Sequence, residues 1–219
     1  MTIQVVSKRR VADHGEVLTH PKEVNAMLDL VTHETQRIDS RFLEPACGTG
    51  NFLAEILCRK LQVVAERYRK SQSDYERFAV LAVSSLYGVE LLQDNVDHCR
   101  KRLLKLVESQ YFRLFGYHGR NCKRFLKSVD YILSCNILHG NALTLRRVAD
   151  DQPIIFSEWS LVGVNSLKRR DFVYDNLVQR TESHTVRRAP DSIDDVFIPK
   201  PIKDYPLIHF LEVANGGID

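Results

Sequence analysis

Residues 42–52 read Phe-Leu-Glu-Pro-Ala-Cys-Gly-Thr-Gly-Asn-Phe. A short apolar run at 41–45 precedes a loop that contains Gly48 and Gly50, and apolar residues then recur every three or four positions as far as Tyr68. That spacing is typical of one face of a helix, so the stretch predicts a strand, a tight loop and a helix. Because glycine has no Cβ atom, the chain can turn sharply here and a ligand can approach the loop's backbone closely. The alternative is that both glycines only terminate the strand.

The segments around this stretch continue the alternation of strands and helices. We expect helices at 15–31 (with Pro21 in the first turn), 75–85 and 92–106, and strands at 86–90, 131–143 and 153–162. Strands that alternate with helices are typical of a parallel sheet covered by helices. The sequence therefore predicts a single α/β domain with a mostly parallel sheet flanked by helices.

The composition is that of an ordinary globular protein. The 219 residues are 44% hydrophobic and 27% charged, which excludes a disordered, collagen-like or membrane-spanning chain. A net charge of +3 is compatible with a nucleic-acid partner but does not indicate one. The five cysteines form no C-x-x-C pair and the eight histidines show no metal-binding spacing, so neither disulfides nor a metal are expected. No signal-peptide pattern is present, and we expect a cytoplasmic protein without a membrane partner.

Glu90 ends the expected strand Leu-Tyr-Gly-Val-Glu at 86–90. In open α/β sheets, ligands bind at the carboxyl ends of parallel strands, and a carboxylate there can accept hydrogen bonds from both hydroxyls of a ribose. The alternative is a solvent-exposed acid that caps the following helix at its positive end.

Together, these segments resemble the amino-DNA methyltransferases, in particular the adenine-N6 modification subunits of bacterial restriction systems. The resemblance covers roughly residues 12–160 and lies in FLEPACGTGNF, YGVEL, GEVLTHPKEVNAML and NILHGNAL. It implies a Rossmann-like methyltransferase fold that binds S-adenosylmethionine. The cofactor-binding residues that it implies are Thr19, Pro21, Glu44, Pro45, Ala46, Cys47, Gly48, Thr49, Gly50, Asn51, Phe52, Glu90, Leu91, Asn141 and Ala142.

The resemblance also implies a role for several of these residues. Glu44 would lie near the methionine end of the cofactor, and Glu90 would bind the ribose. Thr19 and Pro21 belong to a segment that helps to hold the methionine moiety. Asn141 would meet the adenine ring where the family usually has Asp, an exchange that is tolerable because an amide both donates and accepts hydrogen bonds.

The sequence departs from this family at the catalytic tetrapeptide [DNS]-P-P-[YFW], whose polar side chain binds the target amine and whose aromatic ring stacks on the flipped base. No Pro-Pro pair follows the strand expected at 153–162. Aligning strand ends proposes Ser157, Glu158, Trp159 and Ser160 as the candidate catalytic pocket, with Ser157 as the acceptor and Trp159 as the stacking surface. Alternatively, Phe156 and Trp159 are core aromatics and Glu158 is a solvated edge charge.

We expect residues 1–165 to form the S-adenosylmethionine-binding domain and 166–219 a short C-terminal extension, with a linker near 180–195. Without a separate target-recognition domain, sequence-specific binding of DNA would need a partner subunit. The basic clusters at 113–127, 168–170 and 187–188 could contact DNA phosphates, or could form charge pairs on a solvated face.

The leading hypothesis is methyl transfer from S-adenosylmethionine to an adenine amine in DNA by in-line displacement, without a metal. A catalytically silent cofactor-binding homologue or a subunit of a split enzyme is the first alternative. An RNA methyltransferase is the second.

Overall fold

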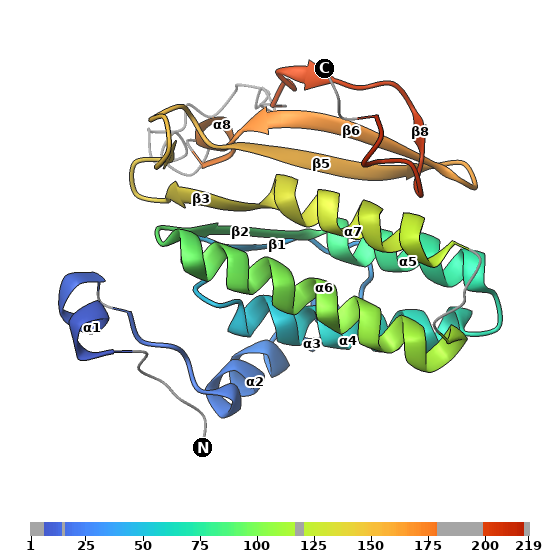
Figure 1. Ribbon diagram of the computed structural model, residues 1–219, viewed down its shortest axis with the longest axis horizontal. Helices are drawn as coiled ribbons and strands as arrows, with labels where there is room; N and C mark the ends of the chain where they lie inside the picture. The colour runs from blue at the N-terminus through green and yellow to red at the C-terminus, as the bar shows by residue number, and fades with distance from the viewer. Residues whose placement is uncertain (1–6, 15, 117–120, 179–198, 217–219) are drawn as a thin grey trace, which may run out of the picture.

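The computed structural model describes residues 7–14, 16–116, 121–178 and 199–216 (Figure 1). Its helices are α1 (Lys8–His14), α2 (Pro21–Asp29), α3 (Thr32–Thr35), α4 (Asn51–Tyr68), α5 (Gln72–Ser84), α6 (Gln93–Phe115), α7 (Cys122–Asn136) and α8 (Tyr174–Val178). Its strands are β1 (Phe42–Glu44), β2 (Leu86–Glu90), β3 (Ile137–Asn141), β4 (Arg146–Arg147), β5 (Ile155–Val162), β6 (Ser166–Val173), β7 (Lys203–Asp204) and β8 (Ile208–His209).

A four-stranded sheet in the order β1-β2-β3-β4 lies at the centre of the molecule. The pairs β1–β2 and β2–β3 are parallel, and β4 pairs antiparallel with β3. Helices α4 and α5 connect β1 to β2, and α6 and α7 connect β2 to β3, because parallel neighbours need such crossover connections. The predicted mixed α/β fold with a mostly parallel sheet and flanking helices is confirmed.

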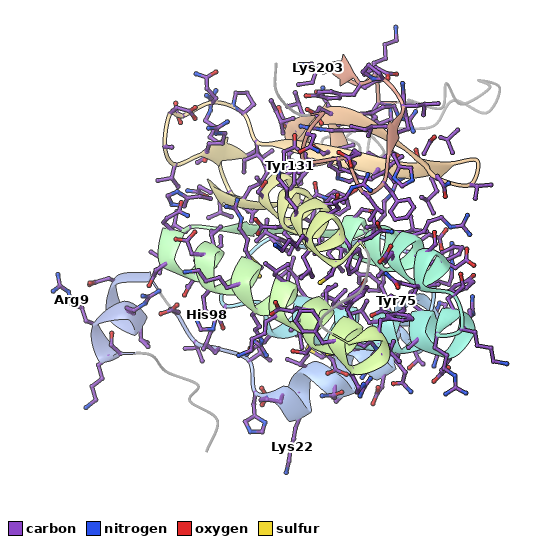
Figure 2. All side chains as sticks on the ribbon, turned by 45° about the vertical axis from the view of Figure 1, so that its right-hand side comes forward. Arg9, Lys22, Tyr75, His98, Tyr131 and Lys203 are labelled. Atoms are coloured by element: carbon purple, nitrogen blue, oxygen red, sulfur yellow. The ribbon has the colours of Figure 1, made fainter. Side chains whose placement is uncertain are left out.

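Helices α4, α5, α6 and α7 pack against one another beside this sheet. Leu53, Leu57, Leu61 and Val64 are fully or almost fully buried along one face of α4, at the predicted three-to-four-residue spacing. They share a core with α5, α6 and α7, and the labelled Tyr75 lies among these helices in Figure 2. In Figure 1, α4 and α6 lie on one side of β1 and β2, and the strands β5 and β6 lie on the other.

The strand predicted at 131–143 is wrong in its first half. Residues 131–136 form the end of α7, and β3 begins only at Ile137. Phe125, Val129, Ile132 and Leu133 are fully buried at helical spacing. The helical spacing begins before Tyr131, in a segment whose basic residues are typical of a polar loop. The apolar run after Tyr131 on its own is typical of a strand.

The strand predicted at 153–162 exists, but not in the parallel sheet. As β5, it pairs antiparallel with β6 from Ile155–Val173 to Val162–Ser166, in a second sheet with β7 and β8. The boundary expected between residues 165 and 166 therefore falls inside a hairpin, and 166–173 is a strand and not an irregular extension. The apolar alternation typical of a strand is absent here, because charged side chains that form ion pairs occupy its central positions, 168–171. The linker expected near 180–195 lies outside the described residues.

In the described part of the chain, each helix is too short or too polar to cross a lipid bilayer.

Candidate functional site

The loop between β1 and α4 requires both of its glycines. Gly48 has φ +51° and Gly50 has φ +81°, the left-handed region that other residues rarely adopt. A Cβ atom on Gly50 would also lie 2.6 Å from the Sγ of Cys99 on α6, whereas one on Gly48 would lie 3.4 Å from Leu18. Gly50 is thus needed to pack the loop on α6, and Gly48 faces the upstream segment.

Hydrogen bonds fix this loop from three sides. The Cys47 amide donates to the carbonyl of Val89 (3.0 Å), which anchors the loop to β2. The Asn51 Nδ2 donates to the carbonyl of Thr19 (2.8 Å), and Arg102 on α6 donates to the Asn51 Oδ1 (2.6 Å). Asn51 therefore joins the upstream segment, the start of α4 and α6.

Glu90 lies at the carboxyl end of β2 and is only 8% exposed. Its Oε2 accepts a hydrogen bond from the Gly48 amide (2.9 Å), and its Oε1 accepts from the amide of Leu92 (3.0 Å) and the Nδ2 of Asn95 (3.4 Å). Glu90 does bind the amide that precedes α6, as the capping alternative holds, but it is buried and also contacts the glycine loop. Glu90 therefore combines the two predicted roles, since it binds the backbone amide before α6 and lies at the candidate site.

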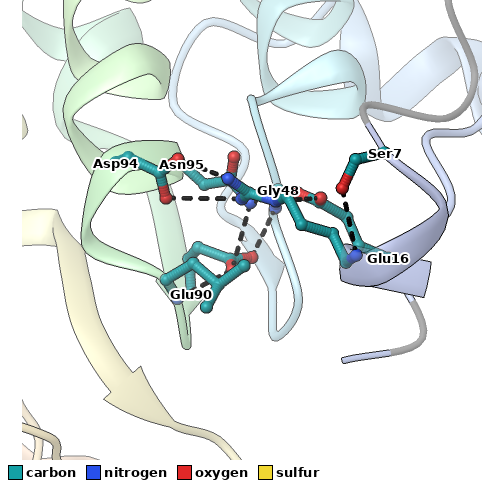
Figure 3. A network of polar contacts seen from close by, with 8 residues as sticks. Ser7, Glu16, Gly48, Glu90, Asp94 and Asn95 are labelled. Atoms are coloured by element: carbon teal, nitrogen blue, oxygen red, sulfur yellow. Dashed lines mark hydrogen bonds and ion pairs between the residues drawn. The ribbon is translucent and has the colours of Figure 1, made fainter. Parts of the chain in front are cut away.

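A second acid, Glu16, lies beside Glu90 (Figure 3). Its Oε1 accepts a hydrogen bond from the Nδ2 of Asn95 (2.6 Å) and from Arg10 (3.0 Å), and Arg10 also binds Asp94. Glu16 and Asn95 are not among the site residues predicted from the sequence. The only sequence signal for them is their position, since Glu16 precedes Thr19 by three residues and Asn95 lies in the first turn after Glu90.

These groups line a crevice of about 540 Å³ at the carboxyl edge of the sheet. The predicted residues that line it are Thr19 and those at 44–48, 51–52, 90–91 and 141–142. The structure adds Glu16, Val17, Leu18, Leu92, Asn95 and Leu143. Pro21, Thr49 and Gly50 do not line it, because Pro21 begins α2 and the chain turns into α4 at Thr49 and Gly50. Four segments far apart in the sequence, at 16–19, 44–52, 90–95 and 141–143, thus meet at one site.

The crevice is acidic. Glu16, Glu44 and Glu90 line it, and none of its described lining residues is Lys, Arg or His. Burial raises the pKa of Glu44 above its ordinary value, although the Ala46 backbone opposes this shift. The Cys47 pKa is also raised, first by its hydrogen bond with Cys99 and then by burial. An acid-lined site favours cationic or hydroxyl-bearing ligands and disfavours phosphates.

Asn141 contributes its amide to the crevice from β3. Its Oδ1 accepts hydrogen bonds from the amides of Leu143 (2.9 Å) and Thr144 (3.4 Å), which closes a turn on its own loop. Its Nδ2 makes no hydrogen bond within the described residues. Asn141 therefore offers a donor to a ligand, while its acceptor is already used.

Residues 157–160 do not line the crevice. Ser157 is 2% exposed and donates to Asp171 (2.7 Å), and Trp159 is 4% exposed in the core. Glu158 is not a solvated charge, since its side chain is 15% exposed and pairs with Arg41 and Arg170. Strand alternation directs Ser157 and Trp159 to one face of β5 and Glu158 to the other, so the four do not form one catalytic pocket. Phe156 is buried as well, as the core alternative predicts.

The basic cluster at 168–170 is engaged in ion pairs. Lys168 pairs with Asp204, Arg169 with Asp171, and Arg170 with Glu158. This fits the alternative of charge pairs, while the cluster at 187–188 lies outside the described residues. Among the residues that the structure describes, no cluster of three or more His, Cys, Asp or Glu could hold a metal ion.

Comparisons of the chain with known protein families, curated proteins and solved structures found no match.

Proposed function

We propose that the crevice binds S-adenosylmethionine and that the protein is a methyltransferase of the amino-DNA type. The observation that carries the proposal is the acid-lined crevice, whose described lining residues include no basic side chain, beside a loop that requires two glycines. S-Adenosylmethionine has a sulfonium, an ammonium group, a carboxylate and a ribose but no phosphate, so its net charge is positive and suits this lining better than the negative charge of ATP or a dinucleotide.

The residues present fit the parts of this cofactor. Glu90 lies where a carboxylate can accept a hydrogen bond from a ribose hydroxyl. Its Oε2 accepts only from the Gly48 amide and keeps a lone pair, whereas its Oε1 already accepts from the Leu92 amide and from Asn95. Glu16 and Glu44 offer negative charge to the ammonium and sulfonium groups, and Phe52 and Leu91 offer apolar surface to the adenine. When bound, the cofactor supplies an activated methyl group. The protein's contribution is positioning and electrostatics.

Calorimetric titration with S-adenosylmethionine tests the cofactor site. We expect the wild type to bind it and to bind ATP at least tenfold more weakly. Gly48→Val should lose at least tenfold in affinity, because a β-branched residue is strained at φ +51° and adds bulk beside Leu18 in the lining of the crevice. The matched control is Gly163→Val in the β5–β6 turn, where φ is also positive (+62°) but a Cβ meets nothing within 4 Å. Equal affinity of wild type and Gly48→Val would refute the site.

A catalytically silent cofactor-binding homologue is the second candidate, favoured by the burial of Ser157 and Trp159. Transfer of a radiolabelled methyl group to unmethylated DNA and to RNA separates the two. Label in DNA supports the first candidate and label in RNA supports an RNA methyltransferase. Cofactor binding without transfer to either supports the silent homologue.

A further inference from the structure

A second cavity, here called the aromatic pocket, shares no lining residue with the crevice. Its volume of about 430 Å³ is within the range of roughly 300–1,000 Å³ for small-molecule sites. Five elements contribute aromatic side chains to its lining, namely Phe42 of β1, Tyr87 of β2, Phe156 of β5, Phe172 of β6 and Tyr174 of α8. The pocket thus lies where the first sheet faces the hairpin of the second sheet.

The aromatic walls are held in place by one another. The Phe156 ring meets Tyr87 edge to face at a centroid distance of 5.4 Å and meets Tyr174 in the same way at 5.1 Å. All three are at most 9% exposed. Leu43 and Leu177 at the rim are 44% and 41% exposed. A flat ring can enter between these leucines and contact preformed aromatic surface.

The charged side of the pocket carries a surplus of positive charge. Glu158 is bound by two guanidinium groups, those of Arg41 and Arg170, so the three side chains sum to one positive charge. The Arg170 Nε is buried and has no hydrogen-bond partner among the described residues. Guanidinium groups bind phosphates strongly, through paired charge-assisted hydrogen bonds.

Two phenol hydroxyls add neutral polar groups to the aromatic walls. Neither Tyr87 nor Tyr174 makes a side-chain hydrogen bond within the described part of the chain. Burial raises the pKa of Tyr87 to about 12, so its hydroxyl stays a donor at neutral pH. The pocket therefore combines flat apolar walls, neutral donors and an anion-binding side.

We propose that the aromatic pocket binds a single nucleotide, with its base against the rings and its phosphate against Arg41 and Arg170. The positive surplus disfavours a cationic ligand, and a purely apolar ligand would leave the guanidinium groups without a further acceptor. The crevice has the opposite charge, so the two sites select different molecules. Leu43 at the pocket and Glu44 at the crevice are consecutive in β1. Identifying this nucleotide as the methyl acceptor rests on the proposed function, whereas the binding itself does not.

Calorimetric titrations with adenosine 5′-monophosphate, adenosine and inorganic phosphate test the pocket. We expect the wild type to bind the nucleotide, and to bind adenosine or phosphate alone at least tenfold more weakly. Arg41→Met should lower nucleotide affinity to that of adenosine, and Arg41→Lys should restore part of it. Arg41 is 58% exposed in its side chain, and Glu158 keeps Arg170 as a partner in both variants, so we expect them to fold.

A steric variant separates the pocket from the crevice. Leu177→Trp fills the pocket from its rim and should weaken nucleotide binding at least tenfold, with unchanged affinity for S-adenosylmethionine. Leu30→Trp is the matched control at a leucine that is 83% exposed at the end of α2, and should change neither affinity. No nucleotide binding by the wild type, or equal binding by Leu177→Trp, would overturn the proposal. If the wild type binds the nucleotide but does not bind S-adenosylmethionine, the result counts only against the proposed function.

Discussion

At the scale of single residues, Lys60 shows how one buried cation organises the start of the sheet. It is fully buried, which is rare for lysine. Its ammonium group contacts the carbonyls of Ile38 and Ser40 and the hydroxyl of Ser85. One side chain of α4 thus joins the segment before β1 to the end of α5, next to the strand that carries Glu44.

This environment predicts a pH-dependent stability. Burial lowers the pKa of Lys60 from 10.5 to about 7. Between these values the unfolded chain binds the proton and the folded chain releases it, so the free energy of unfolding should rise with pH, by roughly 1 kcal/mol per unit. Urea denaturation at pH 7, 8 and 9 measures the slope. Lys60→Met should flatten it, and Lys105→Met, at an exposed position on α6, should not; the same slope in all three proteins would contradict the assignment.

At the scale of elements, the sequence predicted the helices and strands whose apolar residues recur at a regular spacing. The glycine loop and α4 follow from Gly48, Gly50 and the buried face that begins at Leu53. The elements β2 and α6 follow from their own apolar residues. It failed at α7 and β6, where charged residues hide the pattern. In β6, Arg169 and Arg170 make the strand look like a loop, although acids on neighbouring positions neutralise both. Ion pairing across strands depends on register, which one sequence does not reveal.

Asp171 is the acid that holds this hidden strand in place. It is 6% exposed and accepts hydrogen bonds from Ser157 on β5, from Arg169 and from the hydroxyl of Tyr205. Arg169 in turn donates to Tyr131 on α7, which is labelled in Figure 2. The cluster therefore joins β5, β6, α7 and the chain after β7.

Asp171→Asn should destabilise the protein by about 3 kcal/mol, because it leaves a half-buried guanidinium without its counter-charge. The control is Asp204→Asn, which removes an exposed partner of Lys168 and should cost less than about 1 kcal/mol. Chemical denaturation of both variants gives the two values. Similar small losses would show that the Arg169 pair contributes no more than a surface ion pair.

At the scale of the whole molecule, β1 contributes residues to two sites of opposite charge. The crevice presents Glu16, Glu44 and Glu90, and the aromatic pocket presents Arg41 and Arg170. The sequence predicted much of the crevice, since its segments each carry a local motif. It did not predict the pocket, whose walls combine β1 and β2 of the first sheet with β5, β6 and α8, and only the fold brings these elements together. Such a site has no local signature.

The N-terminal helix α1 is tied to the crevice through Glu16, one of its lining residues. Arg10 connects α1 to Glu16 and to Asp94 on α6, and its hydrogen bond holds the pKa of Asp94 below the ordinary value. Arg10→Met should therefore release α1 and free Glu16 to move. We expect faster amide hydrogen exchange across 8–14 and several-fold weaker binding of S-adenosylmethionine. Arg9→Met, on the same helix at a 91% exposed side chain, should change neither. If exchange accelerates but affinity is unchanged, Glu16 does not contact the ligand, and Glu44 and Glu90 alone carry the charge preference.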